Sequence, residues 1–236
     1  MFFNSNDLYT GNEYFKNKPN WDDEYSEWKA QMINQLLHTN NINPEKIIEV
    51  GCGAGGILQG LSTRNPSINS LSGFDISPHA IALAKKKETN KIKFFNTDFL
   101  FDETDNADVL LVIDVVEHVG DYYGFLDKLK SRSKYFVFHI PLDMSCRNLL
   151  KPHTIKQQRD SVGHIHYFTR DTIEWALKDT GYLILDWFYT KPLIDTEQAK
   201  TIKGGIKKFL RKISFSLNKN QSARLWGGYS MMILAR

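Results

Sequence analysis

One stretch constrains the fold of this chain more than any other: a short apolar run that leads into alternating glycines, IIEVGCGAGG at positions 47–56. The run is typical of a buried strand, and Ile57, Leu58 and Leu61 have the spacing of a helix that follows it. Glycine adopts a positive φ without steric cost and lets a ligand approach the backbone closely. The stretch therefore predicts a strand–turn–helix unit whose loop can cradle a nucleotide, although alternating glycines alone are also compatible with a simple turn.

Strand and helix patterns alternate through the rest of the chain. Strands are predicted at 46–50, 71–75, 92–95, 107–113, 135–140, 182–189 and 229–234. The run at 107–113 is apolar throughout, which is typical of a central parallel strand. The alternation predicts an α/β fold: a doubly wound sheet of about seven strands, mostly parallel, with helices on both faces.

The length of 236 residues fits a single domain with four parts. We expect an N-terminal helical cap at 1–44, a ligand-binding core at 45–141, an insertion at 142–168 and a C-terminal part at 169–236. The insertion breaks the alternation directly after the fifth predicted strand. Since such folds bind ligands beyond the carboxyl ends of their strands, the insertion is predicted to form a lid.

Hydropathy and cysteine content indicate in which cellular compartment the protein is expected. No run approaches the ~20 apolar residues of a membrane-spanning helix, and the first residues lack the basic and apolar regions of a signal peptide. The cysteines, Cys52 and Cys146, are too far apart to indicate a disulfide framework or a zinc cluster. We therefore expect a cytoplasmic protein, with a peripheral membrane contact as the alternative.

Acidic residues recur where successive strands end. Asp75 ends the second predicted strand, Asp98 follows the third and Asp114 follows the fourth. The carboxyl ends of parallel strands share one rim of the sheet, so these side chains are expected on the ligand-binding side. Asp75 also has the spacing from the glycines of an acid that accepts hydrogen bonds from ribose hydroxyls. The series favours a nucleotide-containing ligand over a simple glycine turn.

Over roughly residues 45–190 the chain resembles the S-adenosylmethionine-dependent methyltransferases of the Rossmann-like type. The resemblance implies that Glu49 positions the amino group of the cofactor and that Asp75 holds its ribose hydroxyls. It also implies that Asp98 and Phe99 contact the adenine, that Asp114 lies near the methionine end, and that the last strand is antiparallel. The cofactor-binding residues implied in this way are Glu49, Gly51, Cys52, Gly53, Gly55, Asp75, Ile76, Asp98, Phe99 and Asp114.

Two further motifs, DVVEHV at 114–119 and GHIHYFT at 163–169, resemble elements of the ubiquinone-biosynthesis O-methyltransferases and their relatives. This resemblance implies methyl transfer to an oxygen. A hydroxyl acceptor loses its proton as it attacks, and histidine suits that role near neutral pH. The catalytic candidates are His118, His164 and His166. In contrast, His139 lies inside the fifth predicted strand and is expected to be a buried structural residue with satisfied hydrogen bonds.

A divalent metal is the alternative means of activating the acceptor. Small-RNA 2′-O-methyltransferases carry a similar acid-x-x-Glu-His set with a later histidine and use it to hold a metal. By that resemblance Asp114, Glu117, His118 and His166 would bind magnesium or manganese. The favoured expectation is a metal-free site, in which Glu117 stabilises the start of the following helix and His118 shapes the pocket.

Charge is concentrated near the C-terminus, where residues 198–236 hold nine basic and no acidic residues. Within this part, apolar residues recur at helical spacing at Ile206, Phe209, Leu210, Ile213 and Leu217, flanked by lysines and an arginine. Basic amphipathic helices bind anionic membrane surfaces, although many pack on their own domain. The segment 203–219 is therefore predicted either to contact a membrane or to pack internally.

We expect an enzyme that transfers the methyl group of S-adenosylmethionine to a small-molecule, glycan or lipid-linked acceptor at a hydroxyl oxygen. RNA 2′-O-methylation is one alternative, but nucleic acid is not the favoured partner because aromatics are not interleaved with the basic stretch. The other alternative is a non-catalytic protein that binds the cofactor or a partner, since a fold alone does not establish activity.

Overall fold

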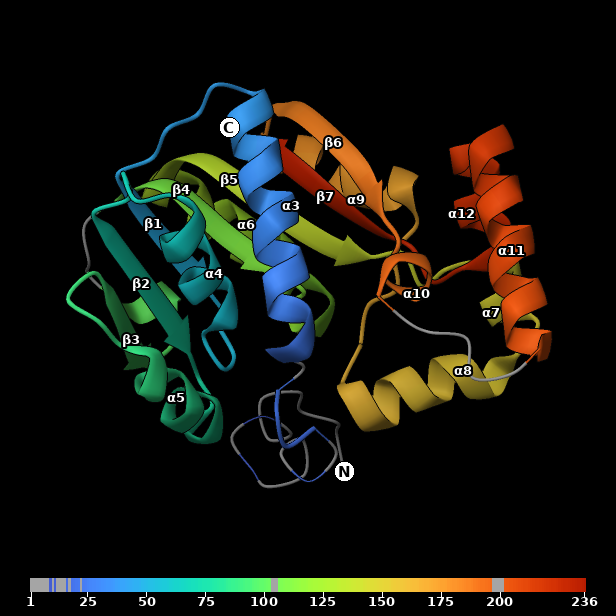
Figure 1. Ribbon diagram of the computed structural model, residues 1–236, viewed down its shortest axis with the longest axis horizontal. Coiled ribbons are helices and arrows are strands. Elements are labelled where there is room, and N and C mark those ends of the chain that lie inside the picture. Colours follow the sequence, from blue (N-terminus) through green and yellow to red (C-terminus); the bar gives the residue numbers. More distant parts are fainter. Residues whose placement is uncertain are drawn as a thin grey trace.

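A seven-stranded sheet in the order β3-β2-β1-β4-β5-β7-β6 forms the centre of the molecule (Figure 1). The computed structural model describes residues 9, 11, 16, 18–21, 23–102, 106–196 and 202–236. The strands are β1 (Lys46–Val50), β2 (Ser70–Asp75), β3 (Ile92–Asn96), β4 (Ala107–Ile113), β5 (Ser133–Pro141), β6 (Ile184–Thr190) and β7 (Ser230–Ala235). Neighbouring strands pair in parallel except at β7, which is antiparallel to both β5 and β6. The predicted sheet and its reversed last strand are confirmed.

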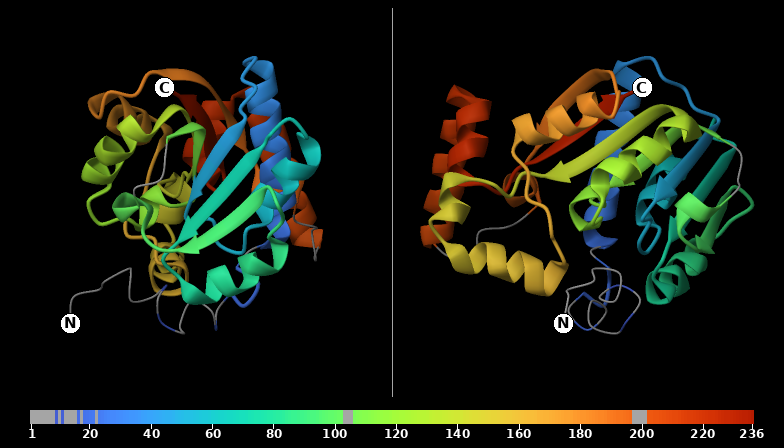
Figure 2. Two further views of the ribbon diagram at one scale, coloured as in Figure 1. Left: turned by 90° about the vertical axis from the view of Figure 1, so that its left-hand side faces the viewer. Right: turned by 180° about the vertical axis from the view of Figure 1, so that it is seen from behind.

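Helices cover both faces of the sheet, as the sequence predicts (Figure 2). One face carries α3 (Ser26–Thr39), α4 (Gly56–Arg64) and α5 (Pro78–Ala84); the other carries α6 (Tyr122–Leu129) and α9 (Arg170–Asp179). Because side chains alternate along a strand, β4 contributes to both layers. Val109 and Leu111 pack with α3 and α4, whereas Leu110 and Val112 pack with α6 and α9.

Shorter elements fill the connections. They are η1 (Asp23–Tyr25), η2 (Lys85–Lys87), η3 (Phe99–Phe101), η4 (Val116–His118), η5 (Lys130–Arg132), α7 (Cys146–Leu149), α8 (Pro152–Gln157), the π-helical η6 (Gln158–Val162) and α10 (Pro192–Asp195). The predicted insertion at 142–168 thus holds α7, α8 and η6 beyond the carboxyl end of β5; its role as a lid stays a prediction. Most of the first 20 residues of the predicted N-terminal cap lie outside the described residues.

The C-terminal basic part forms two helices, α11 (Ile202–Leu217) and α12 (Lys219–Trp226), before β7. The sixth strand begins at Ile184 instead of 182, because the Tyr182 amide donates to the Leu177 carbonyl at 2.8 Å and so belongs to the turn that ends α9. Within the described residues, no helix combines the length and apolarity needed to cross a bilayer.

The sheet order positions a ligand site at the end of β1. Strand β2 pairs with one side of β1 and β4 with the other, so the loops after β1 and β4 diverge to opposite faces. This reversal of strand order is where open α/β sheets bind ligands.

Candidate active site

The glycine loop after β1 is closely packed on both sides. Gly51 and Gly53 have φ of +71° and +52°, which side chains rarely adopt. A Cβ added at Gly51 would lie 2.5 Å from Val115 Cγ2, and one at Gly53 would lie 2.7 Å from Trp21 Cδ1. The loop therefore needs glycine both for its conformation and for the close approach of its neighbours.

Asp75, at the end of β2, holds this loop in place. Its Oδ2 accepts a hydrogen bond from the Gly53 amide at 2.9 Å, and its Oδ1 accepts one from the Ser77 amide at 2.8 Å. Burial raises the pKa of Asp75 to about 6, against the lowering effect of these two amides. Each carboxylate oxygen can accept more than one hydrogen bond, so Asp75 retains acceptors for the ribose hydroxyls expected there.

Glu49, on β1, is a buried carboxylate without a full set of partners. Its Oε2 has no hydrogen-bond partner among the described residues. Burial raises the pKa of Glu49 well above its usual value; the charge of Lys29 opposes the shift and that of Asp75 adds to it. An ammonium group would supply the missing donor and favour the charged form. The site therefore fits the amino group of S-adenosylmethionine.

Three residues that the sequence places around the cofactor have packing or capping contacts within the chain. The Phe99 ring is 1% exposed and packs edge-on against Phe74, which removes it from the contacts available to the adenine ring. Asp98 caps η3 by accepting from the Leu100 amide at 2.9 Å. Cys52 turns its side chain into the core, so only its backbone can line the loop.

Asp114 is held by a histidine and a lysine. Its Oδ1 lies 2.6 Å from His139 Nδ1, and its Oδ2 lies 2.6 Å from Lys29 Nζ. Burial alone would raise the pKa of Asp114, but His139 and Lys29 together keep it well below its usual value. His139 also bonds Thr190 Oγ1 through Nε2 at 2.8 Å, so the prediction that it is a satisfied buried residue is confirmed.

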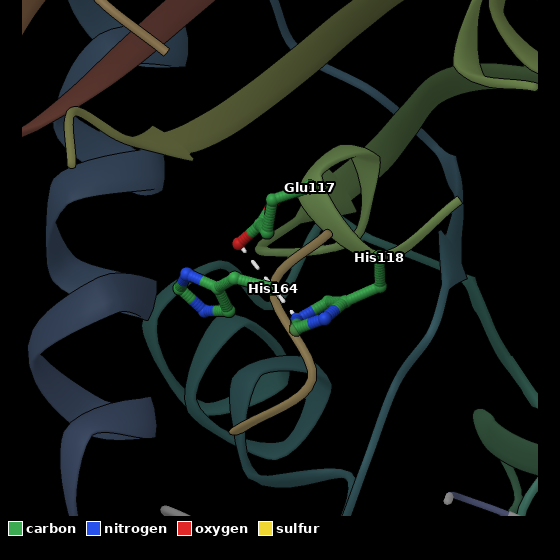
Figure 3. Close-up of side chains that lie close together, drawn as sticks. All are labelled: Glu117, His118 and His164. Carbon is green, nitrogen blue, oxygen red and sulfur yellow. Dashed lines mark ion pairs between the residues drawn. The ribbon is translucent and has the colours of Figure 1, made fainter. Parts of the chain in front are cut away.

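Three other residues converge beside this network: Glu117 and His118 from η4, and His164 from the segment after η6 (Figure 3). One ligand atom from each lies within 4.8 Å of the others. The backbone brings them together, because the amides of Ile165 and His166 donate to the Glu117 carbonyl at 2.9 and 3.1 Å. The sequence favours a metal-free site, and this cluster differs from the alternative metal set because it contains His164 in place of Asp114 and His166.

His118 presents an unprotonated nitrogen to the cluster. Its Nδ1 lies 3.0 Å from the Gly163 carbonyl oxygen and 2.7 Å from the Tyr9 hydroxyl, which itself donates to the Val162 carbonyl at 2.6 Å. Since a carbonyl only accepts, Nδ1 carries the proton and Nε2 keeps its lone pair. Burial and the nearby His164 lower the pKa of His118 to about 4, so the ring is neutral at pH 7.

His164 is oriented by an acid. Its Nδ1 lies 2.7 Å from Asp143 Oδ2, and the other oxygen of Asp143 accepts from Gln158. The carboxylate fixes the proton on Nδ1 and leaves the Nε2 lone pair available. Sequence reasoning missed Asp143, although it lies two residues beyond β5, as Asp98 lies two residues beyond β3.

Glu117 is the least satisfied member of the cluster. Its carboxyl group is fully buried, and neither oxygen has a hydrogen-bond partner in the part of the chain that the structure describes. Burial, followed by the charge of Asp114, raises the pKa of Glu117 well above its usual value. The group is therefore either protonated or matched by a cation. Two imidazole nitrogens and one carboxylate fit a divalent ion that keeps further coordination positions open. Both imidazoles are oriented by a hydrogen bond from their other ring nitrogen.

His166 lies apart from the cluster. Its Nε2 is 3.1 Å from the Gly120 carbonyl oxygen, and its ring packs edge-on against Tyr122. Of the histidines proposed from the sequence, His118 and His164 share one site, whereas His166 is engaged elsewhere.

Comparisons with known proteins identify the family. Residues 22–186 match the methyltransferase domain family. A 99-residue segment is 27% identical to the ubiquinone biosynthesis O-methyltransferase of Rickettsia typhi, and it covers 42% of this chain and only 40% of that relative.

Solved structures share the fold. The magnesium protoporphyrin IX methyltransferase of Synechocystis PCC 6803 with bound S-adenosylhomocysteine has a TM-score of 0.59 at 16% identity, over 89% of this chain and 82% of that one. A plantazolicin methyltransferase with S-adenosylhomocysteine has a TM-score of 0.63 at 16% identity, over 98% and 92% of the two chains. The chain belongs to the methyltransferase domain family, and it shares its Rossmann-like fold with methyltransferases whose structures contain S-adenosylhomocysteine.

Proposed function

We propose that this enzyme methylates a hydroxyl oxygen of a small-molecule, glycan or lipid-linked acceptor, with His164 as the general base. The observation that carries the proposal is the Asp143–His164 pair, with 2.7 Å between Oδ2 and Nδ1. A base backed by a carboxylate is suited to an acceptor that loses a proton on attack, such as a hydroxyl. The name of the Rickettsia typhi relative, an O-methyltransferase, supports oxygen as the acceptor atom.

Different residues of this chain bind the cofactor and transfer the proton. Bound S-adenosylmethionine supplies an electrophilic methyl group. Glu49 holds the amino group of the cofactor and Asp75 holds its ribose hydroxyls. The glycines let the cofactor lie close to the backbone of the loop. His164 takes the acceptor proton at Nε2, and Asp143 stabilises the resulting imidazolium. The fixed positions of acceptor and cofactor account for much of the rate.

A metal-assisted variant of the same reaction rests on the two unpartnered oxygens of Glu117. Glu117, His118 and His164 would hold a divalent ion, which would lower the pKa of an acceptor hydroxyl. Thermal unfolding of the purified protein with and without Mg²⁺, Mn²⁺ or Zn²⁺ tests this directly. A metal-dependent rise in Tm that Glu117→Gln abolishes supports the variant, and no rise with any ion contradicts it.

The experiment that tests the proposal is methyl transfer from labelled S-adenosylmethionine to fractionated cell extract, followed by mass spectrometry of the labelled product. The proposal predicts label on an oxygen of a small or lipid-extractable molecule. Label that disappears after ribonuclease treatment would instead identify RNA as the acceptor. A protein that binds S-adenosylhomocysteine but labels nothing in any fraction would be a non-catalytic binding protein.

A further inference from the structure

Helix α11 is attached to the domain through its polar side. Four of its half-buried residues, Gly204, Lys208, Arg211 and Phe215, have the spacing of one helical face, and the half-buried Gly205 and Ser214 lie at its two margins. Arg211 donates to the Trp226 carbonyl at 3.2 Å, and the Phe215 ring stacks on Tyr229 with 5.2 Å between centroids. The inner face of α11 is thus mostly small, basic or polar.

The opposite face of α11 carries five large apolar side chains, here called the outer stripe: Ile206, Phe209, Leu210, Ile213 and Leu217. They are between 42% and 82% exposed. The helix lies at the outer edge of the molecule, away from the sheet, in both views that show it clearly (Figures 1 and 2). An amphipathic helix of a globular domain normally turns its apolar face to the core, so this orientation indicates an external apolar partner.

The charges beside the stripe identify the kind of partner. Lys207 and Lys212 are exposed on its two sides, at about 100° and 120° around the helix from Ile206. No acidic residue occurs anywhere from Ile202 to Arg236. A second copy packed stripe to stripe would bring like charges together, which is unfavourable. An anionic lipid surface offers acyl chains to the stripe and negative headgroups to the lysines.

We propose that α11 docks the enzyme on anionic membranes, with the outer stripe among the acyl chains and Lys207 and Lys212 at the headgroups. This inference does not depend on which acceptor the enzyme methylates. It does place the enzyme where a lipid-linked acceptor would be available.

Co-sedimentation of the full chain with vesicles tests the proposal. We expect binding to vesicles of equal parts phosphatidylcholine and phosphatidylglycerol, and little binding to phosphatidylcholine alone. The double variant Phe209→Ser/Ile213→Ser should lose binding. The double variant Lys207→Gln/Lys212→Gln should weaken it roughly tenfold or more, from the contribution of each lysine near an anionic surface. Leu183→Ser, which removes a 52% exposed apolar side chain from the connection between α9 and β6, should bind like the unaltered chain.

Three results would overturn the proposal. The first is the absence of binding to anionic vesicles. The second is binding that survives loss of the outer stripe, with circular dichroism showing that the variant is folded. The third is a dimer, seen by analytical ultracentrifugation in the absence of vesicles, that Phe209→Ser/Ile213→Ser converts to monomer, because the stripe would then be covered by a second copy.

Discussion

The ammonium of Lys29 lies 2.6 Å from Oδ2 of Asp114 and joins α3 to the carboxyl end of β4. The other oxygen of Asp114 is held by His139 from β5. Asp114 itself has a φ of +55°, and the next residue, Val115, packs against the glycine loop. One half-buried carboxylate thus connects the N-terminal helix, two central strands and the glycine loop.

Removing the lysine from the Lys29–Asp114 pair should destabilise the fold. Lys29→Met leaves the half-buried Asp114 without its lysine partner, and we expect the free energy of unfolding to fall by about 2 kcal/mol. Urea denaturation measures this change. Lys156→Met removes a lysine from an exposed i,i+4 pair and should change stability by less than about 0.5 kcal/mol. Equal losses in the two variants would show that the Lys29–Asp114 pair has no special structural role.

The free energy of unfolding should increase with pH between about 4 and 6.5, because His118 takes up a proton more readily in the unfolded chain. The folded-state pKa of about 4 is below the ordinary value of 6.5, so the unfolded chain binds the proton first as pH falls. The resulting destabilisation approaches about 3 kcal/mol at pH 4. His118→Gln should flatten the dependence of unfolding free energy on pH in this range. If the two proteins show parallel pH profiles, His118 is not held neutral as the geometry implies.

The affinity for S-adenosylhomocysteine should fall below pH 6 because of Asp75. Its pKa is raised to about 6, and the ribose hydroxyls need the ionised carboxylate as acceptor. Protons therefore compete with the ligand, and Kd should rise by up to about tenfold for each pH unit below 6. Isothermal titration calorimetry across this range measures the effect. Asp75→Asn should bind weakly at every pH with a flatter profile, and a pH-independent Kd in the unaltered protein would contradict the assignment.

The contributions of Glu49 and Asp75 to ligand affinity can be distinguished by the choice of ligand. Glu49→Gln removes the charged partner of the amino group, so Kd for S-adenosylhomocysteine should rise roughly 10- to 100-fold. Adenosine lacks that amino group, and its affinity should stay unchanged in Glu49→Gln but fall in Asp75→Asn. Calorimetry with both ligands gives the comparison. Equal losses for both ligands in Glu49→Gln would indicate general disruption of the loop instead of a lost contact.

The sequence predicts the sheet well because strand and helix periodicity is local. The apolar run of β4 and the glycines after β1 need no distant information, and acids at strand ends follow from the shared rim of a parallel sheet. The expected ring contact of Phe99 fails because burial depends on how Phe74 and Phe99 pack, which spacing does not reveal.

The cluster of Glu117, His118 and His164 could be predicted only in part. His118 and His164 were among the candidates, but so was His166, which shares a motif with His164 and bonds Gly120 instead. The choice between them depends on the path of the insertion, which has no periodic pattern. Lys29 and Asp114 form an ion pair although they are 85 residues apart in the sequence. No local sequence pattern predicts a contact between residues so far apart.

The central claim is that His164 deprotonates the acceptor. Its most direct test is the rate of labelled methyl transfer to the acceptor fraction by His164→Gln and by the matched control His166→Gln. We expect His164→Gln to lower kcat by about 10²- to 10⁴-fold while binding of S-adenosylhomocysteine is retained, and His166→Gln to stay within a few-fold of the unaltered enzyme. Unchanged turnover in His164→Gln, or an equal loss in both variants, would contradict it.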